Sequence, residues 1–269
     1  MKAENYLEIN KQAWNNQVPV HLDSDFYNMD GFLKGKNSVP KIDLELLGNI
    51  VGKSILHLQC HFGQDTLSLA RLGGKCTGID LSDKAIEKAK ELNKQLKLDA
   101  KFICADVYDT PNHLKEQFDI VYTSYGAIGW LPDLDKWAKV ISHFLKPNGK
   151  LVFVEFHPVI WMFDDNFTKI QYHYHNEKAI AEEQSGTYAE KDTDIKTDYI
   201  GWNHSLAEVF QALLNNGLQI ESFEEYDYSN YNCFNETVEF EPGKFRIKHL
   251  ENKIPMMYSL TAIKNNFIF

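Results

Sequence analysis

Between residues 54 and 156, short apolar runs alternate with amphipathic stretches, and this regularity leaves few folds open. The apolar runs are nearly continuous, which is typical of strands that are buried on both faces of a parallel sheet. Helices between the strands cover those faces, and right-handed crossovers then predict a doubly wound α/β sheet. The expected strands are 54–58, 75–79, 101–105, 118–124 and 150–156, and the expected helices are 65–72, one that begins after Ser82, and 133–145.

The flanking segments complete a single domain over residues 1–269. Tyr6, Ile9, Ala13 and Trp14 share one side of an N-terminal helix, which Pro19 is expected to end. Residues 41–52 predict a further short helix, and residues 157–201, rich in aromatic side chains, histidines and acids, form an inserted segment.

A last helix and two late strands follow the insertion. Ser205 and Glu208 make a capping box at the start of that helix. The strands 218–226 and 255–264 have no good helix between them, so they are expected to pair antiparallel. The predicted fold is a Rossmann-like, mostly parallel sheet with an antiparallel last strand. Its parts are a helical cap at 1–49, a core at 50–156, the insertion at 157–201, and the final helix and strand pair at 202–269.

Composition restricts the partners and the compartment. The net charge of −10 and the lack of a Lys/Arg run argue against nucleic acid and against an anionic membrane surface. No apolar run reaches membrane length, so a spanning segment is not expected. The four cysteines show no CxxC spacing, which favours reduced thiols in a cytoplasmic protein.

Polar residues follow three of the expected strands, at the sheet edge where ligands bind in such folds. They are the loop Gln59–Gln64, Asp80 and Asp106. An acid about 20 residues beyond such a loop is typical of a residue that binds ribose hydroxyls. The Asp106 carboxylate can accept a hydrogen bond from an adenine amino group, and the Val107 backbone N–H can meet a ring nitrogen.

The loop after the first strand holds a single glycine, Gly63. A dinucleotide pyrophosphate needs three glycines, because the backbone must approach two crowded phosphates. S-adenosylmethionine carries no phosphate, and one glycine is compatible with it. The bulky loop therefore argues against NAD and FAD and favours S-adenosylmethionine.

Four stretches, taken in order, resemble the motifs of class I S-adenosylmethionine-dependent methyltransferases of the small-molecule methyltransferase-domain group: HLQCHFG, GID, ADV and TSYGAIGWL. The resemblance covers roughly residues 50–156. In that family an acid and then Gly-Cys-Gly-x-Gly usually follow the first strand. Here Cys60 and Gly63 match, His57 stands at the acid, and Gln59 and His61 replace glycines. Because that acid helps to hold the methionine ammonium group, Gln59 or a loop carbonyl is the candidate substitute.

The resemblance implies that S-adenosyl-L-methionine is the cofactor of the core. It places Asp80 on the ribose, Leu81 beside the adenine, Asp106 and Val107 at the adenine edge, and Ser124 near the methionine part. The implied cofactor-binding residues are Gln59, Cys60, His61, Phe62, Gly63, Asp80, Leu81, Ala105, Asp106, Val107 and Ser124.

Substrate-side candidates come from the cap, from the fourth-strand loop and from the insertion. Trp14, Tyr27, Trp130 and Trp161 are expected to line the substrate pocket, with the N-terminal segment folding over the cofactor as a lid, as such segments often do in the resembled family. Tyr125 and His157 are the candidate catalytic residues, and His157 is the candidate general base. The alternative for His157 is a hydrogen bond that holds the loop beside Pro158. Gln171, His173 and His175 share a strand face but lack further ligands, so no metal is expected.

The leading hypothesis is an enzyme that transfers a methyl group from S-adenosylmethionine to a small-molecule acceptor by in-line displacement. A nicotinamide-dependent oxidoreductase would need the glycine triplet that the loop lacks. A non-catalytic S-adenosylmethionine-binding protein stays open because the loop is altered. The acceptor, the attacking atom (O, N, S or C) and the oligomeric state are left open, a homodimer being one candidate.

Overall fold

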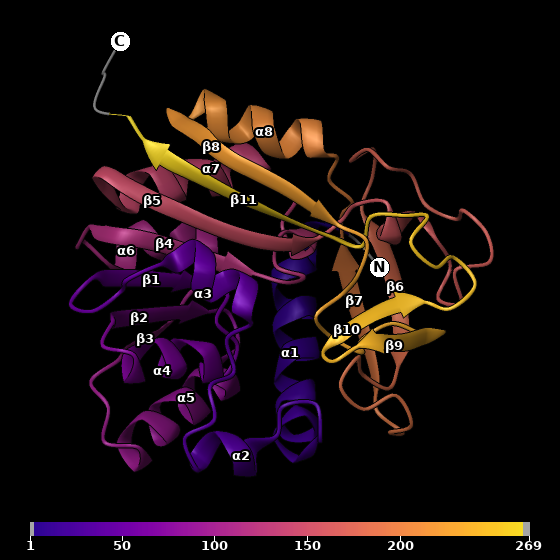
Figure 1. Cartoon of the computed structure of the whole chain (residues 1–269), viewed down its shortest axis with the longest axis horizontal. Coiled ribbons are helices and arrows are strands. Elements are labelled where there is room, and N and C mark those ends of the chain that lie inside the picture. Colours follow the sequence, from indigo (N-terminus) through magenta and orange to yellow (C-terminus); the bar gives the residue numbers. More distant parts are fainter. Residues whose placement is uncertain (1–2, 266–269) are drawn as a thin grey trace.

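A computed structural model of the chain describes residues 3–265, so the outermost residues of the 1–49 and 202–269 segments lie outside it. A seven-stranded sheet forms the centre, in the order β3-β2-β1-β4-β5-β11-β8 (Figure 1). The five strands from β3 to β5 pair in parallel, whereas β11 runs antiparallel to both of its neighbours, β5 and β8. The strands are β1 (Ser54–Leu58), β2 (Lys75–Asp80), β3 (Lys101–Cys104), β4 (Phe118–Ser124), β5 (Leu145–Phe156), β8 (Leu218–Tyr226) and β11 (Met257–Lys264). The predicted fold class and the antiparallel last strand are confirmed.

One strand begins earlier than its pattern indicates. β5 was expected from residue 150 but starts at Leu145, which pairs with Phe118. The register then shifts, so that Ile120 pairs with Lys150, and the residues in between bulge out around Asn148, whose φ is 60°. A Pro-Asn-Gly stretch thus interrupts the pairing but does not end the strand.

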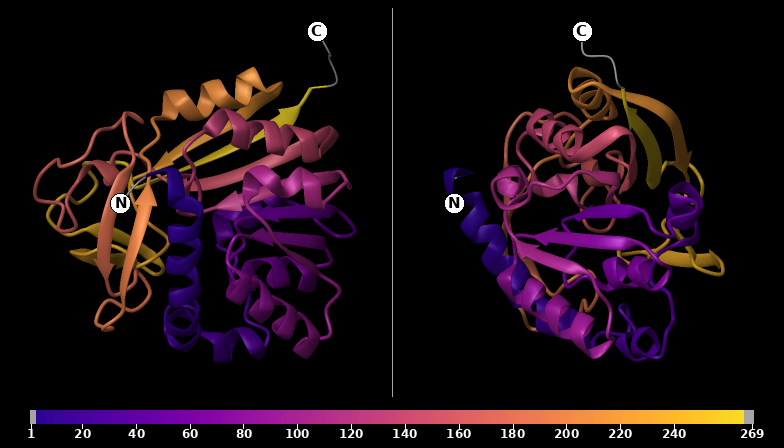
Figure 2. Two further views of the ribbon diagram at one scale, coloured as in Figure 1. Left: turned by 180° about the vertical axis from the view of Figure 1, so that it is seen from behind. Right: turned by 90° about the vertical axis from the view of Figure 1, so that its left-hand side faces the viewer.

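Helices cover both faces of the sheet (Figure 2). On one face α4 and α5 pack on β1–β3 through residues such as Leu67, Ile86 and Phe102, and the N-terminal helices join the same apolar cluster. On the other face α7 and α8 pack through Trp137, Ile141 and Val209. The helices are α1 (Tyr6–Asp23), α2 (Met29–Leu33), α3 (Lys41–Leu47), α4 (Gln64–Arg71), α5 (Asp83–Gln95), α6 (Thr110–His113), α7 (Leu134–Phe144) and α8 (Leu206–Asn215).

The N-terminal helix differs from its prediction. Pro19 lies inside α1 instead of ending it. The side that α1 buries is largely polar: Asn10, Ala13, Asn15, Gln17, Val18 and His21. Asn10 makes two hydrogen bonds to the backbone of Ile200, and Asn15 accepts one from Ser82. Such contacts outweigh the helix-breaking tendency of proline, because tertiary structure routinely overrides local propensity.

Two hairpins stand beyond the carboxyl ends of the parallel strands, with α1 between them and the core (Figure 1). The insertion supplies β6 (Ile180–Ser185) and β7 (Lys196–Gly201), which contacts α1. The connection between β8 and β11 supplies β9 (Thr237–Glu241) and β10 (Lys244–Ile247), which the sequence pattern did not indicate. These segments enclose a space at the sheet edge where polar residues were expected to meet.

Candidate active site

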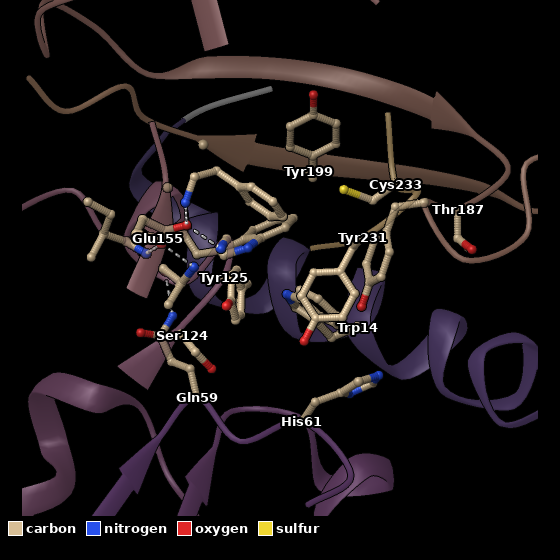
Figure 3. A pocket seen from close by; sticks show the side chains of 18 of the residues that line it. Trp14, Gln59, His61, Ser124, Tyr125, Glu155, Thr187, Tyr199, Tyr231 and Cys233 are labelled. Atoms are coloured by element: carbon tan, nitrogen blue, oxygen red, sulfur yellow. Dashed lines mark hydrogen bonds between the residues drawn. The ribbon is translucent and has the colours of Figure 1, made fainter. Parts of the chain in front are cut away.

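A cavity of about 960 Å³ lies at the carboxyl ends of the parallel strands. Its walls come from α1, the loops after β1, β2, β3 and β4, the insertion, and residues 231–235 (Figure 3). Of the residues expected to bind cofactor, all but Gly63 and Ala105 line it, and so do the four expected pocket aromatics and Tyr125. The structure therefore brings together residues that are up to 252 positions apart, from Tyr6 to Tyr258.

In the loop after β1, Gln59 and His61 adopt backbone angles that glycine usually adopts. Gln59 and His61 have φ values of 55° and 51°, in the left-handed region that costs a non-glycine residue roughly 1–2 kcal/mol. Side-chain contacts offset this cost: Gln59 Nε2 donates to Ala127 O at 2.7 Å, and His61 Nε2 lies 2.9 Å from His21 Nδ1. At Gly63, φ is 75°, and an added Cβ would meet the Phe102 ring at 2.5 Å. Gly63 is thus required by packing and need not touch the ligand.

Asp80 ties this loop to the end of β2. Its Oδ2 accepts the His61 backbone N–H at 2.7 Å, and its Oδ1 accepts the Ser82 N–H at 2.8 Å. Burial raises the pKa of Asp80 to about 6, while the two backbone donors oppose the rise. A carboxylate has about four acceptor sites, so Asp80 retains capacity for ligand hydroxyls. Asp106, at the end of β3, also lines the cavity, and burial raises its pKa.

A buried acid that the sequence pattern did not single out organises the loop after β4. Glu155, 2% exposed near the end of β5, accepts backbone N–H groups from Gly126, Ala127 (2.8 Å) and Ile128 (3.2 Å). A fourth comes from Phe156 at 2.6 Å. Burial raises the pKa of Glu155, and these donors oppose the rise. The available signal was a lone acid inside the apolar run LVFVEF.

Aromatic side chains form the wall opposite the strand ends. The Trp14 ring lies 5.1 Å from His61 and 5.2 Å from Trp130, measured between centroids. Tyr27 and Tyr188 share a hydrogen bond between their hydroxyls. These rings come from α1, from η3 (Ile128–Trp130), from the segment before α2 and from the insertion, and they give this side of the cavity a largely apolar surface.

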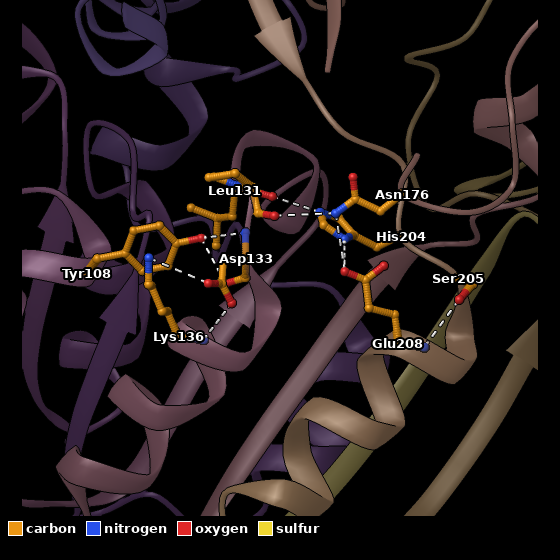
Figure 4. A network of polar contacts seen from close by, with 9 residues as sticks. Tyr108, Leu131, Asp133, Lys136, Asn176, His204, Ser205 and Glu208 are labelled. Carbon is orange, nitrogen blue, oxygen red and sulfur yellow. Dashed lines mark hydrogen bonds and ion pairs between the residues drawn. The ribbon is translucent and has the colours of Figure 1, made fainter. Parts of the chain in front are cut away.

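Polar contacts fasten the start of α8 to the loop after β4 (Figure 4). His204 Nε2 lies 2.8 Å from Leu131 O, and His204 Nδ1 lies 2.9 Å from Glu208 Oε1. One half of the predicted capping box is present, because Ser205 Oγ accepts the Glu208 N–H at 3.2 Å, whereas the Glu208 carboxylate bonds His204. The start of α8 is thereby joined to the loop that carries Trp130.

His157 lies outside the cavity lining. It is 3% exposed; its Nδ1 accepts the Val159 N–H at 3.2 Å, and its Nε2 lies 2.8 Å from Glu225 Oε1. Burial lowers its pKa, and Glu225 opposes this. Both ring nitrogens have hydrogen-bond partners, and these bonds hold the start of the loop after β5 in place. The structure therefore supports the loop-holding alternative and leaves neither nitrogen of His157 available to a ligand.

The chemistry of the donors fits S-adenosylmethionine. Gln59 Oε1 is buried and has no hydrogen-bond partner among the described residues, and a carbonyl oxygen can accept from an ammonium group. Asp80 suits ribose hydroxyls, and Asp106 suits an adenine amino group. The cavity is lined by two lysines, Lys36 and Lys191, and by no arginine of residues 3–265. No group of three or more His, Cys, Asp or Glu within residues 3–265 is arranged to hold a metal ion.

Comparison with known proteins points the same way. Residues 55–149 match the family described as Methyltransferase domain. A Coxiella burnetii ubiquinone biosynthesis O-methyltransferase is 28% identical over 135 residues, 49% of this chain and 57% of the relative. The chain thus spans little more than half the length of that relative.

Solved structures share the fold across nearly the whole chain. A Clostridium acetobutylicum S-adenosylmethionine-dependent methyltransferase superposes with a TM-score of 0.58 at 16% identity, covering 96% of this chain and 99% of that one. The Streptomyces coelicolor geranyl diphosphate C-methyltransferase superposes with a TM-score of 0.60 at 14% identity, covering 98% and 100%. Residues 55–149 thus match a methyltransferase domain, and nearly the whole chain shares the fold of solved S-adenosylmethionine-dependent methyltransferases.

Proposed function

We propose that the protein transfers a methyl group from S-adenosylmethionine to a small-molecule acceptor by in-line displacement. The observation that carries the proposal is the cavity itself, which combines nucleoside-type acceptors at the strand ends with an aromatic wall facing them. When bound, S-adenosylmethionine supplies a methyl group on a sulfonium: the acceptor's lone pair forms the new bond, and the pair of the broken carbon–sulfur bond stays on sulfur.

The residues of this chain would position and shield the reactants. Gln59, Asp80 and Asp106 would hold the ammonium, ribose and adenine ends, in line with their places around the cavity. Aromatic faces such as Trp14 and Trp130 attract positive charge and exclude water, and most of the rate enhancement in such a displacement comes from positioning.

The acceptor class is inferred from the enclosure of the cavity. The insertion, α1 and residues 231–235 surround it, and the chain's net charge of −10 disfavours nucleic acid. Named relatives act through different atoms, an O-methyltransferase and a C-methyltransferase among them, so the names leave the acceptor atom open. The described cysteines are all free, which supports a reducing compartment such as the cytoplasm. No helix within residues 3–265 is long and apolar enough to cross a bilayer.

Calorimetric titration followed by a methylation screen tests this function. We expect S-adenosylmethionine and S-adenosylhomocysteine to bind and NAD not to bind. We also expect methyl-labelled S-adenosylmethionine to be consumed in the presence of at least one compound of a metabolite panel. Binding of NAD alone would overturn the proposal in favour of an oxidoreductase. Tight S-adenosylmethionine binding with no transfer to any panel member would favour the non-catalytic binder.

A further inference from the structure

A second buried acid lies just behind the cavity. Asp43, in α3, is fully buried, and two tyrosines of β4 and its following loop donate hydrogen bonds to it. Tyr122 Oη donates to Asp43 Oδ1 at 2.6 Å, and Tyr125 Oη donates to Asp43 Oδ2 at 2.7 Å. The three side chains form one connected polar cluster, although Asp43 is 79 and 82 residues from its partners.

The two tyrosines differ in one respect that matters for function. Tyr125 lines the cavity, whereas Tyr122 is fully buried and does not. Tyr125 Oη also accepts a hydrogen bond from Asn230 Nδ2 at 2.9 Å. A phenol oxygen has two lone pairs, so one remains to accept a hydrogen bond from a ligand in the cavity.

The groups that affect the pKa of the Asp43 carboxyl include no cation. Tyr122 and Tyr125 face it from β4 and its loop, and Asp65 from α4 adds negative charge. Tyr231, which packs on Tyr125, is a further titratable neighbour, and Lys150 of β5 donates to Leu46 O near the end of α3. Burial without a counter-ion raises the pKa of Asp43 to about 7, although the two phenols stabilise the charged form. A base titrating near neutral pH suits proton transfer at working pH.

We propose that Tyr125 and Asp43 form the proton-accepting pair of this site. The acceptor's proton moves to Tyr125 Oη while the Tyr125 proton moves to Asp43 Oδ2, which leaves the phenol neutral and the carboxyl protonated. After the products leave, the proton returns from Asp43 through Tyr125 Oη to solvent in the cavity. The inference rests on the proposed methyl transfer and narrows its substrate class. The acceptor carries a proton on its nucleophile, as a hydroxyl or an ammonium does, and is not a thioether. Tyr125 is the catalytic residue, and Asp43 is a positioning residue that acts through it.

The test compares Asp43→Asn and Tyr125→Phe with Tyr122→Phe, which removes the same kind of hydrogen bond without touching the cavity. S-adenosylhomocysteine titration is done first on all four proteins, and we expect unchanged affinity. If the wild type fails to bind it, the proposed function itself fails, before the proton pair is tested.

Infrared difference titration of the S-adenosylhomocysteine complexes then follows the carboxyl groups. We expect a protonated carboxyl band with a midpoint near neutral pH that is missing in Asp43→Asn. Both phenylalanine variants should move that midpoint to higher pH, because each loses a hydrogen bond to the charged form. A carboxyl at position 43 that stays ionised well into the acid range would overturn the proposal, and this readout needs no acceptor.

Turnover of the compound found by the metabolite panel gives the last readout. Asp43→Asn and Tyr125→Phe should lower kcat by on the order of 100-fold or more, with KM nearly unchanged, since that is what a lost proton acceptor costs. Tyr122→Phe should lower kcat far less and shift the acidic limb of the pH profile to higher pH. Equal losses in both phenylalanine variants, a retained kcat in Asp43→Asn, or a product methylated on a thioether would each overturn the proposal.

Discussion

His21 Nδ1 and His61 Nε2 lie 2.9 Å apart, so a single hydrogen bond joins the N-terminal helix to the loop after β1. The other nitrogens, His21 Nε2 and His61 Nδ1, are buried and have no partner among the described residues. Burial lowers the pKa of His21 to about 3 and that of His61 well below its usual value. Both rings are therefore neutral near pH 7, and α1 is joined to the loop after β1 by uncharged groups.

Lowering the pH should reduce the free energy of unfolding through this histidine pair. The unfolded His21 binds a proton below about pH 6.5, whereas the folded one does not until about pH 3, so stability is lost as pH falls through that window. The free energy of unfolding should fall by roughly 1.4 kcal/mol per pH unit for His21 alone. Urea unfolding of the wild type and His21→Gln between pH 7 and 4.5 measures the difference. The exposed His175→Gln variant is the control and should follow the wild type; a His21→Gln curve parallel to the wild type would contradict the expectation.

Asp43 should change the pH dependence of stability in the direction opposite to His21. The folded carboxyl keeps its proton up to about pH 7, whereas the unfolded one loses it near pH 3.8, so its contribution to stability decreases as pH rises through that interval. Asp43→Asn cannot titrate, so its stability relative to the wild type should improve steadily from pH 4 to pH 7. Chemical denaturation at several pH values gives this difference, with the exposed Asp30→Asn as control. A flat difference curve would show that Asp43 is ionised in the folded protein.

Gly63→Ala should lower the free energy of unfolding by more than the left-handed backbone angle alone would cost. Gly243 has nearly the same φ, 72° against 75°, but nothing lies within 4 Å of a Cβ added there. Gly243→Ala therefore measures the left-handed cost, roughly 1–2 kcal/mol. Gly63→Ala adds the collision with Phe102 and should lower the unfolding free energy further and weaken S-adenosylhomocysteine binding. Thermal unfolding and calorimetry check both effects, and equal losses in the two variants would refute the packing argument.

Asp80→Ala should weaken cofactor binding by about 1–3 kcal/mol, the cost of losing hydrogen bonds to a charged group. The loss has two sources, since the carboxylate would hold the ribose and already holds the His61 backbone N–H. Asp109→Ala, an exposed acid outside the cavity lining, provides the comparison. Isothermal titration with S-adenosylmethionine measures both; unchanged affinity in a folded Asp80→Ala protein would count against the proposed site.

Glu155→Gln should destabilise the protein by about 1–3 kcal/mol, because an amide nitrogen would face backbone donors that the carboxylate now accepts. The exposed Glu221→Gln on β8 should leave the urea midpoint in place. Hydrogen exchange at residues 126–128 gives a local readout. Unaltered protection of these amides in Glu155→Gln would show that the acid does not hold the loop.

Local patterns in the chain were enough to predict the mostly parallel sheet and to name residues that line one end of the cavity. Near-continuous apolar runs and helical spacing depend on neighbours a few residues apart, so the core strands and helices and the mostly parallel sheet followed from them. Gln59, His61, Asp80 and Asp106 were named for the same reason, since they directly follow such runs.

Contacts between distant segments could not be read in this way. The Asp43–Tyr125 bond spans 82 residues and the His21–His61 bond 40, and the polar side of α1 resembles an exposed helix until its partners are known. His157 looked available at a strand end, yet Glu225 of β8 and the Val159 N–H occupy it. Hydrophobic periodicity records which side of an element is buried. It does not record which buried polar groups meet, because that depends on how the elements pack in three dimensions.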